Sequence, residues 1–142
     1  MQLVFTPPHG LLYDAERALR WEVLRRPLGH ARGTERFDFE DEALHLVAVE
    51  DGEVVGCVLF HADGTGGGRL FQMAVREDRQ GTGLGARLVR HLEDRLRQDG
   101  VREVRLHARM TAHGFYEKLG YVGDGTLYIE VGLPHMIMTR AL

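Results

Sequence analysis

Three glycines alternate in the segment Gln80-Gly81-Thr82-Gly83-Leu84-Gly85, which follows an apolar run and precedes a helical pattern. Glycine has no Cβ atom, so it adopts positive φ readily and lets a ligand approach the backbone. The first N–H groups of a helix lack intrahelical partners and together carry about half a positive charge. A diphosphate can accept hydrogen bonds from several of these groups at once. The segment therefore predicts an anion site that needs no lysine.

Two better-known phosphate motifs do not match this segment. A dinucleotide fold has Gly-x-Gly-x-x-Gly with an acidic residue about twenty positions later, whereas the spacing here is Gly-x-Gly-x-Gly. A P-loop contains Gly-Lys-Ser or Gly-Lys-Thr, and this sequence is missing. Glycines also occur in loops that bind nothing, so the segment by itself leaves a purely structural turn open.

A long helix is predicted directly after the glycines, from Gly83 to about Gln98. Leucines recur at every fourth position, as one apolar face of a helix requires: Leu84, Leu88, Leu92 and Leu96. Gly100 ends the pattern. The glycine segment is therefore expected at the start of a helix whose apolar face is buried.

Strands are predicted before the glycines. The apolar runs Leu44–Val49 and Glu53–Phe60 are joined by Glu50-Asp51-Gly52, and Asp-Gly between apolar runs is a strong hairpin signal. Arg69–Val75 is expected to form a third strand of the same sheet. Upstream, Asp14 is expected to cap a helix that runs to about Leu24.

The remaining elements follow the long helix. Val101–Ala108 alternates as a strand, a helix opens at Thr111 or Ala112 and ends at Gly120, and Tyr121–Tyr128 and Met136–Arg140 are two closing strands. This order predicts an α/β fold in which an antiparallel N-terminal sheet is joined to a βαβ unit. One domain over residues 1–142 is expected.

Composition restricts the partners of this protein. Of 142 residues, 44% are hydrophobic and 27% are charged, and the net charge of −3 argues against a nucleic-acid binder. No segment approaches the roughly 20 apolar residues of a membrane span, and no leader pattern opens the chain, so a cytoplasmic protein without a membrane partner is expected. Cys57, the only cysteine, lies in an apolar run and is read as a small core residue.

Two segments in the right order resemble the GNAT superfamily of N-acetyltransferases. The glycine segment is similar to the superfamily's acetyl-CoA signature, and Phe115-Tyr116-Glu117-Lys118-Leu119-Gly120-Tyr121 looks like its Phe-Tyr-x-Lys-x-Gly-Phe/Tyr element. The ending Glu130–Met138 resembles the tail of the ElaA/YjcF-like branch, and Leu19–Arg25 resembles the first helix of that branch. The chain departs from the branch at Pro27-Leu28-Gly29, which puts the shape of the acceptor pocket in doubt.

The resemblance implies a GNAT-type fold with a splayed central strand pair and acetyl-CoA as the acyl donor. One strand of this pair would contact the pantetheine arm through its backbone, and the glycine loop would hold the diphosphate. The Phe-Tyr-x-Lys element would supply two further contacts to the coenzyme. The expected coenzyme residues are Met73, Ala74, Val75, Gln80, Gly81, Thr82, Gly83, Leu84, Gly85, Ala86, Phe115 and Lys118.

Catalytic roles also follow from the resemblance. Tyr116 is expected to be the general acid at the coenzyme sulfur, since a phenol can give a proton to a thiolate; packing against the coenzyme is the alternative. His107, with a suitable ordinary pKa, and Glu130 are the candidate bases, while structural roles stay open for both. His135 is assigned to the acceptor pocket or to its turn. No metal site is expected, because His107, His113 and His135 lack a ligand spacing.

The implied reaction is direct transfer of an acetyl group to a primary amine of a small molecule or a protein. A catalytically silent acyl-CoA-binding sensor, or an interaction domain on the same fold, is the alternative. The acceptor would be selected by the loops around Gly29–Glu42 and Tyr128–His135. Homodimers are common in the superfamily, although no exposed apolar stripe demands one here.

Overall fold

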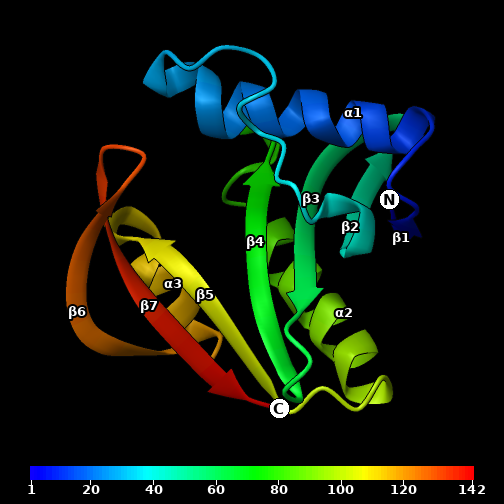
Figure 1. The fold of residues 1–142 in the computed structure, drawn as a ribbon. Coiled ribbons are helices and arrows are strands. Elements are labelled where there is room, and N and C mark those ends of the chain that lie inside the picture. The colour runs from blue at the N-terminus through cyan, green and yellow to red at the C-terminus, as the bar shows by residue number, and fades with distance from the viewer.

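A mixed seven-stranded sheet forms the frame of the molecule (Figure 1). The computed structural model describes residues 1–142. The strands are β1 Gln2–Thr6, β2 Leu44–Glu50, β3 Glu53–Ala62, β4 Gly67–Val75, β5 Glu103–Arg109, β6 Val122–Glu130 and β7 Leu133–Ala141. Their order is β1-β2-β3-β4-β5-β7-β6, and only β4 and β5 pair in parallel. The predicted antiparallel sheet joined to a βαβ unit is confirmed.

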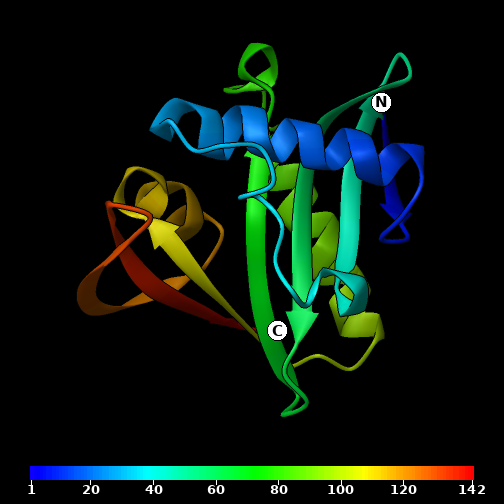
Figure 2. The ribbon, with the colours of Figure 1, turned by 45° about the horizontal axis from the view of Figure 1, so that its top comes forward.

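Helices cover both faces of the sheet. The helix α1 (Leu11–Arg20) crosses one face, while α2 (Leu84–Gln98) and the short α3 (His113–Lys118) lie on the other, as Figures 1 and 2 show. The larger core packs between the sheet and α2, and a smaller cluster that includes Leu19 and the buried Cys57 packs under α1. No helix combines the length and apolar character that a membrane crossing requires.

The strands β4 and β5 separate along their length. They pair only at their first residues, Gly67–Leu70 with Glu103–Leu106, and then diverge (Figure 1). A β-bulge accompanies the separation, because Gln72 has a φ of +53° and the register with β3 shifts opposite it. A bulge bends its strand and increases the local twist. The facing edges of both strands are therefore open where the resemblance predicted a splay.

The long helix α2 agrees with its predicted bounds. It spans Leu84–Gln98, with Gly83 as its N-cap at a φ of +85°, and Gly100 follows its end at +81°. The predicted leucine face is buried throughout. Local pattern was sufficient here because the apolar stripe and both terminating glycines lie within one short segment.

Two predictions of secondary structure were wrong, and one strand was not predicted. The first helix begins at Leu11 after Gly10, so Asp14 lies in its first turn rather than capping it, and the helix continues as a wider turn over Trp21–Arg25. The edge strand β1 was missed, because five residues are too few for a clear period. The expected loop Tyr128–His135 is instead the end of a hairpin, with Tyr128 opposite His135 across β6 and β7.

Candidate active site

The glycine loop presents a row of free backbone donors. No backbone N–H from Gly81 to Ala86 donates to a protein acceptor, and the first bond of the helix start runs from the Arg87 N–H to the Gly83 carbonyl at 3.1 Å. Gly81 and Gly83 have φ angles of +76° and +85°, which L side chains rarely adopt. These angles turn successive N–H groups outward at the positive end of α2. The predicted anion site therefore has the geometry it requires.

The third glycine of the loop serves a different purpose. Gly85 has an ordinary helical φ, but a Cβ there would lie 2.9 Å from the Met73 Cε and 3.2 Å from the Phe115 ring. It allows the start of α2 to approach β4 and α3 closely. Of the three glycines, only Gly81 and Gly83 therefore use the positive φ that glycine allows.

Side chains of the loop brace it rather than extend from it. The Gln80 side chain donates to the Val75 carbonyl at 2.9 Å, and the Thr82 hydroxyl donates to the Arg79 carbonyl at 2.5 Å. Lys118, on α3, is exposed and forms no ion pair. The Gln80 backbone N–H also donates within the chain, to the Glu77 carbonyl at 3.3 Å, so a backbone contact to the coenzyme is expected from Thr82 and not from Gln80.

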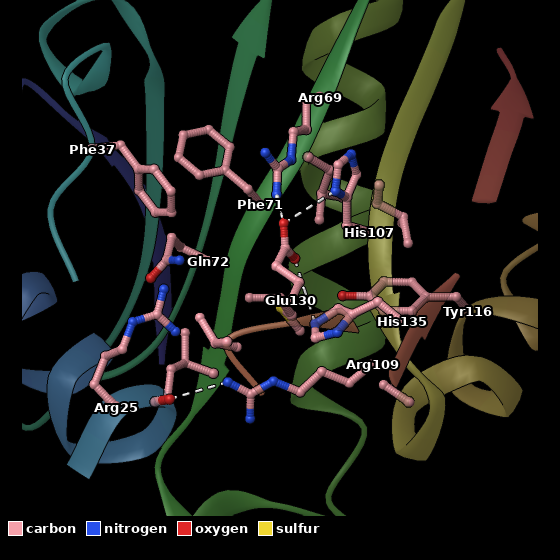
Figure 3. Close-up of a pocket in the computed structure, with 16 residues that line it drawn as sticks. Arg25, Phe37, Arg69, Phe71, Gln72, His107, Arg109, Tyr116, Glu130 and His135 are labelled. Atoms are coloured by element: carbon pink, nitrogen blue, oxygen red, sulfur yellow. Dashed lines mark hydrogen bonds and ion pairs between the residues drawn. The ribbon is translucent and has the colours of Figure 1, made fainter. Parts of the chain in front are cut away.

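A cavity of about 190 Å³ lies on the α1 side of the separated strands (Figure 3). Its walls come from β4, β5, the turn after α1, the β6–β7 hairpin and α3. Five of the predicted site residues line it: Met73, His107, Tyr116, Glu130 and His135. No residue of the glycine loop lines this cavity. The two predicted sites thus occupy different regions around the same strand separation.

Glu130 is the centre of the polar contacts in the cavity (Figure 3). Its carboxylate lies 3.7 Å from an Arg69 terminal nitrogen, 3.4 Å from His107 Nδ1 and 3.5 Å from His135 Nε2. The His135 Nδ1 also contacts the Leu133 carbonyl at 2.8 Å, which fixes the ring inside the hairpin. The structure therefore brings together three residues that the sequence could only name separately.

The environment of His107 keeps its imidazole neutral. Burial, and then the charge of Arg69, lower its pKa below the ordinary value and outweigh the opposing effect of Glu130. A neutral imidazole at neutral pH can accept a proton. His107 is thus suited to act as a base.

Tyr116 is buried and lies at the edge of the same cavity. Its ring packs edge-on against Phe115 and Tyr121, at centroid distances of 4.9 and 5.8 Å, and its hydroxyl forms no hydrogen bond within the chain. Burial raises its pKa, so the phenol stays protonated. Complete proton transfer to a thiolate becomes less favourable as the pKa values diverge. Donation of a hydrogen bond fits this environment better.

Several charged residues of the cavity were not singled out from the sequence. Arg25, Arg69 and Arg109 line it, as does Gln72 of the bulge. Arg109 alternates with His107 along β5, so strand periodicity would have placed both side chains on one face. No local signal marks Arg25, which reaches the cavity only because of the turn after α1.

A buried ionic cluster holds the α1 side of the cavity in place. Arg20 is fully buried and donates to Glu16 at 2.9 Å, to both carboxylate oxygens of Glu40, to the Glu35 carbonyl and to the Gln72 side chain at 3.3 Å. Buried charges require such partners. The cluster joins α1, the following loop and the bulge of β4, and so it positions the wall of the cavity.

The fold is that of the GNAT-type acyltransferases, with a parted parallel strand pair, an open helix start beside it and a charged cavity on the α1 side. Residues 13–121 match the family described as Acetyltransferase (GNAT) family. An uncharacterized acetyltransferase from Streptococcus pyogenes is 33% identical over 101 residues, which cover 70% of this chain and 69% of that protein. The chain therefore belongs to the GNAT family.

Solved structures agree with this assignment. Escherichia coli ElaA is similar at a TM-score of 0.84 with 19% identity, over 98% of each chain. An aminoglycoside 6'-N-acetyltransferase complexed with coenzyme A is similar at a TM-score of 0.76 with 20% identity, over 99% of this chain and 97% of that one. At these identities the likeness concerns the fold alone.

Proposed function

We propose that this protein transfers an acetyl group from acetyl-CoA directly to a primary amine. The observation that carries the proposal is the row of unpaired N–H groups from Gly81 to Ala86, next to the open edges of β4 and β5. A diphosphate would accept from this row. The pantetheine arm would add to the open edge of β4 along Met73, Ala74 and Val75 in the manner of an extra strand. A similar fold has been solved in complex with coenzyme A, which supports the choice of coenzyme.

In the proposed reaction the thioester lies between the separated strands and the amine enters from the cavity. His107, with Glu130 beside it, would take the proton that the amine loses as it attacks the thioester carbonyl. The Tyr116 hydroxyl would donate a hydrogen bond to the sulfur as its negative charge develops. The remaining acceleration would come from holding amine and thioester in near-attack geometry.

Release of free thiol from acetyl-CoA in the presence of a panel of amines tests the proposed function. We expect amine-dependent thiol release together with formation of an acetylated product, identified by mass. Binding of acetyl-CoA without transfer to any amine would instead favour a silent acyl-CoA sensor. Absence of acetyl-CoA binding in calorimetry would overturn both interpretations.

Gly83→Val is expected to weaken acetyl-CoA binding by about 10-fold or more, because displaced donors lose charge-assisted hydrogen bonds. Gly100→Val is a matched control. Both glycines have φ near +80°, and a Cβ added to either would meet no atom within 4 Å, but they lie at opposite ends of α2. Each change costs about 1–2 kcal/mol of stability through backbone strain. Calorimetric titration with acetyl-CoA should separate them, and equal affinities of the two variants would contradict the loop assignment.

The pH dependence of kcat/KM should reveal His107. Deprotonation of the amine acceptor contributes a slope of about one to log kcat/KM against pH in every variant. The lowered pKa of His107 keeps it neutral near pH 7, so its protonation should add a second unit of slope only below about pH 6.5. His107→Gln should lose the added slope. If His107→Gln retains the added slope, another group accepts the proton. Glu130→Gln is then the next variant to test.

A further inference from the structure

Arg25 and Arg109 form a cationic pair at one end of the cavity, apart from the contact of Arg69 with Glu130 (Figure 3). Each donates a single hydrogen bond to a backbone carbonyl: Arg25 Nε to Thr34 at 3.3 Å, and an Arg109 terminal nitrogen to Leu24 at 3.0 Å. Neither has a carboxylate partner. Since a guanidinium has five N–H groups, most donors of the pair are free.

Both guanidinium groups are partly buried, and the charge of Arg109 acts on Arg25. Burial, and next the charge of Arg109, lower the pKa of Arg25. Burial also lowers the pKa of Arg109, and in both arginines the charge of Glu130 opposes the lowering without outweighing it. Bringing like charges together out of water is costly unless an anion lies between them. An anionic ligand would remove this cost.

The charge of the whole cavity also favours an anionic ligand. Its lining contains three arginines and a single carboxylate, that of Glu130, although the chain as a whole has a net charge of −3. The positive surplus is therefore a local feature. It would repel polyamines and other acceptors that carry several cationic groups.

The coenzyme phosphates do not account for the arginine pair. No residue from Gln80 to Ala86 lines the cavity, and that loop has its own row of unpaired donors. The diphosphate and the arginine pair thus belong to different regions around the strand separation. The pair faces the side from which the acceptor would enter.

We propose that the acceptor is a small amine carrying an anionic oxygen group, a carboxylate or a phosphate, which Arg25 and Arg109 bind. Planar guanidinium groups match the paired oxygens of both anions. The bound anion would orient the molecule so that its amine faces Glu130 and His107. This inference rests on the proposed function and names its substrate class.

Matched acceptors test the proposal, with kcat/KM measured by thiol release. Each amino acid is compared with its primary amide, and phosphoethanolamine with ethanolamine, so that the anion is the principal difference. We expect at least one anionic class to be preferred by about 10-fold or more. The amide has the less basic amine, which favours its reaction, so basicity does not explain a preference for the acid. The two pairs distinguish carboxylate from phosphate.

Arg25→Gln and Arg109→Gln should each reduce that preference by about 10-fold. Arg26→Gln is the control, because Arg26 is the sequence neighbour of Arg25 and pairs with Glu22 at the surface; it should leave the ratio unchanged. Arg25→Lys keeps the charge without the planar fork and should give an intermediate ratio. Melting curves check that each variant is folded. If Arg25→Gln does not fold, the result for Arg109→Gln decides the test.

The outcomes separate this inference from the proposed function. Transfer to amines without any preference for the anionic member overturns the inference and leaves the proposed function intact. If no amine is acetylated, the proposed function fails. The arginine pair is then tested by calorimetric titration of glycine, glycinamide and phosphoethanolamine onto the coenzyme A complex. Equal binding of charged and uncharged members, or unchanged binding in Arg109→Gln, would overturn the inference there too.

Discussion

Tyr116→Phe is expected to lower kcat by about 10²- to 10³-fold, the usual effect of removing one donor that stabilises developing charge. The change removes a single hydroxyl that forms no hydrogen bond in the free protein, and the ring retains its packing on Phe115 and Tyr121. The affinity for acetyl-CoA should therefore change by less than about 2-fold, because the lost interaction strengthens only as the sulfur becomes negative. Single-turnover kinetics and calorimetry measure the two quantities.

Tyr121→Phe is the matched control for this experiment. It also removes one hydroxyl from a buried tyrosine, but that hydroxyl donates to Glu93 of α2 at 2.9 Å, and Tyr121 does not line the cavity. It should reduce stability and leave kcat unchanged. Unchanged kcat in Tyr116→Phe would limit Tyr116 to a packing role. An equal loss of kcat in both variants would indicate that removing any hydroxyl from the aromatic cluster disturbs the enzyme.

Arg20→Met is expected to lower the free energy of unfolding by about 3–5 kcal/mol, as breaking one side of a buried ion pair does. Glu16 and Glu40 are fully buried and would lose their guanidinium partner. Methionine keeps the apolar part of the arginine side chain and is flexible enough to fill part of the space left by the guanidinium, so most of the loss would come from unpaired charge. Urea unfolding of both proteins measures the difference.

A surface pair provides the control for Arg20→Met. Arg26 pairs with Glu22, and their side chains are 60% and 50% exposed, so Arg26→Met should cost less than about 1 kcal/mol. A cost below about 1 kcal/mol for Arg20→Met as well would contradict the structural importance of the buried cluster.

At acid pH the free energies of unfolding of Arg20→Met and the wild type should differ less than at neutral pH. Although burial raises the pKa of Glu40, its hydrogen bonds from Arg20 and Tyr13 lower the net value. A lowered carboxyl pKa contributes stability above the unfolded value, about 4.3, and this stability is lost as the pH falls through the folded value. In the variant the unpaired carboxyl would protonate more readily and avoid the penalty of a buried charge. The gap in unfolding free energy should therefore shrink as the pH falls, first above the unfolded value as the variant carboxyl protonates, and then below it as the wild type loses its contribution.

Much of the fold was predictable because its signals are local. The helix α2, the hairpin of β2 and β3 and the glycine loop are each specified within a short stretch of chain, by periodicity, an Asp-Gly turn and alternating glycines. The edge strand β1 was not predictable, because its existence depends on pairing with β2 about forty positions away. The β-bulge at Gln72 was also invisible, since it is defined only by the register with β3.

By itself, the sequence determined the glycine loop, the start of α2 that follows it and the Phe115–Tyr121 element, and these were sufficient to indicate the family. Only the tertiary structure decided which residues meet Glu130, that Gly85 serves close packing, and that Arg25 and Arg109 share one cavity. Those contacts join residues that lie far apart in the chain, such as Arg69 with Glu130 at 3.7 Å and Arg109 with Leu24 at 3.0 Å. Proximity of this kind follows from the separation of β4 and β5, the turn after α1 and the β6–β7 hairpin, which no local pattern specifies together. A phosphate site could be predicted from the chain because it would use consecutive backbone groups, whereas the proposed acceptor site would use side chains that only the fold assembles.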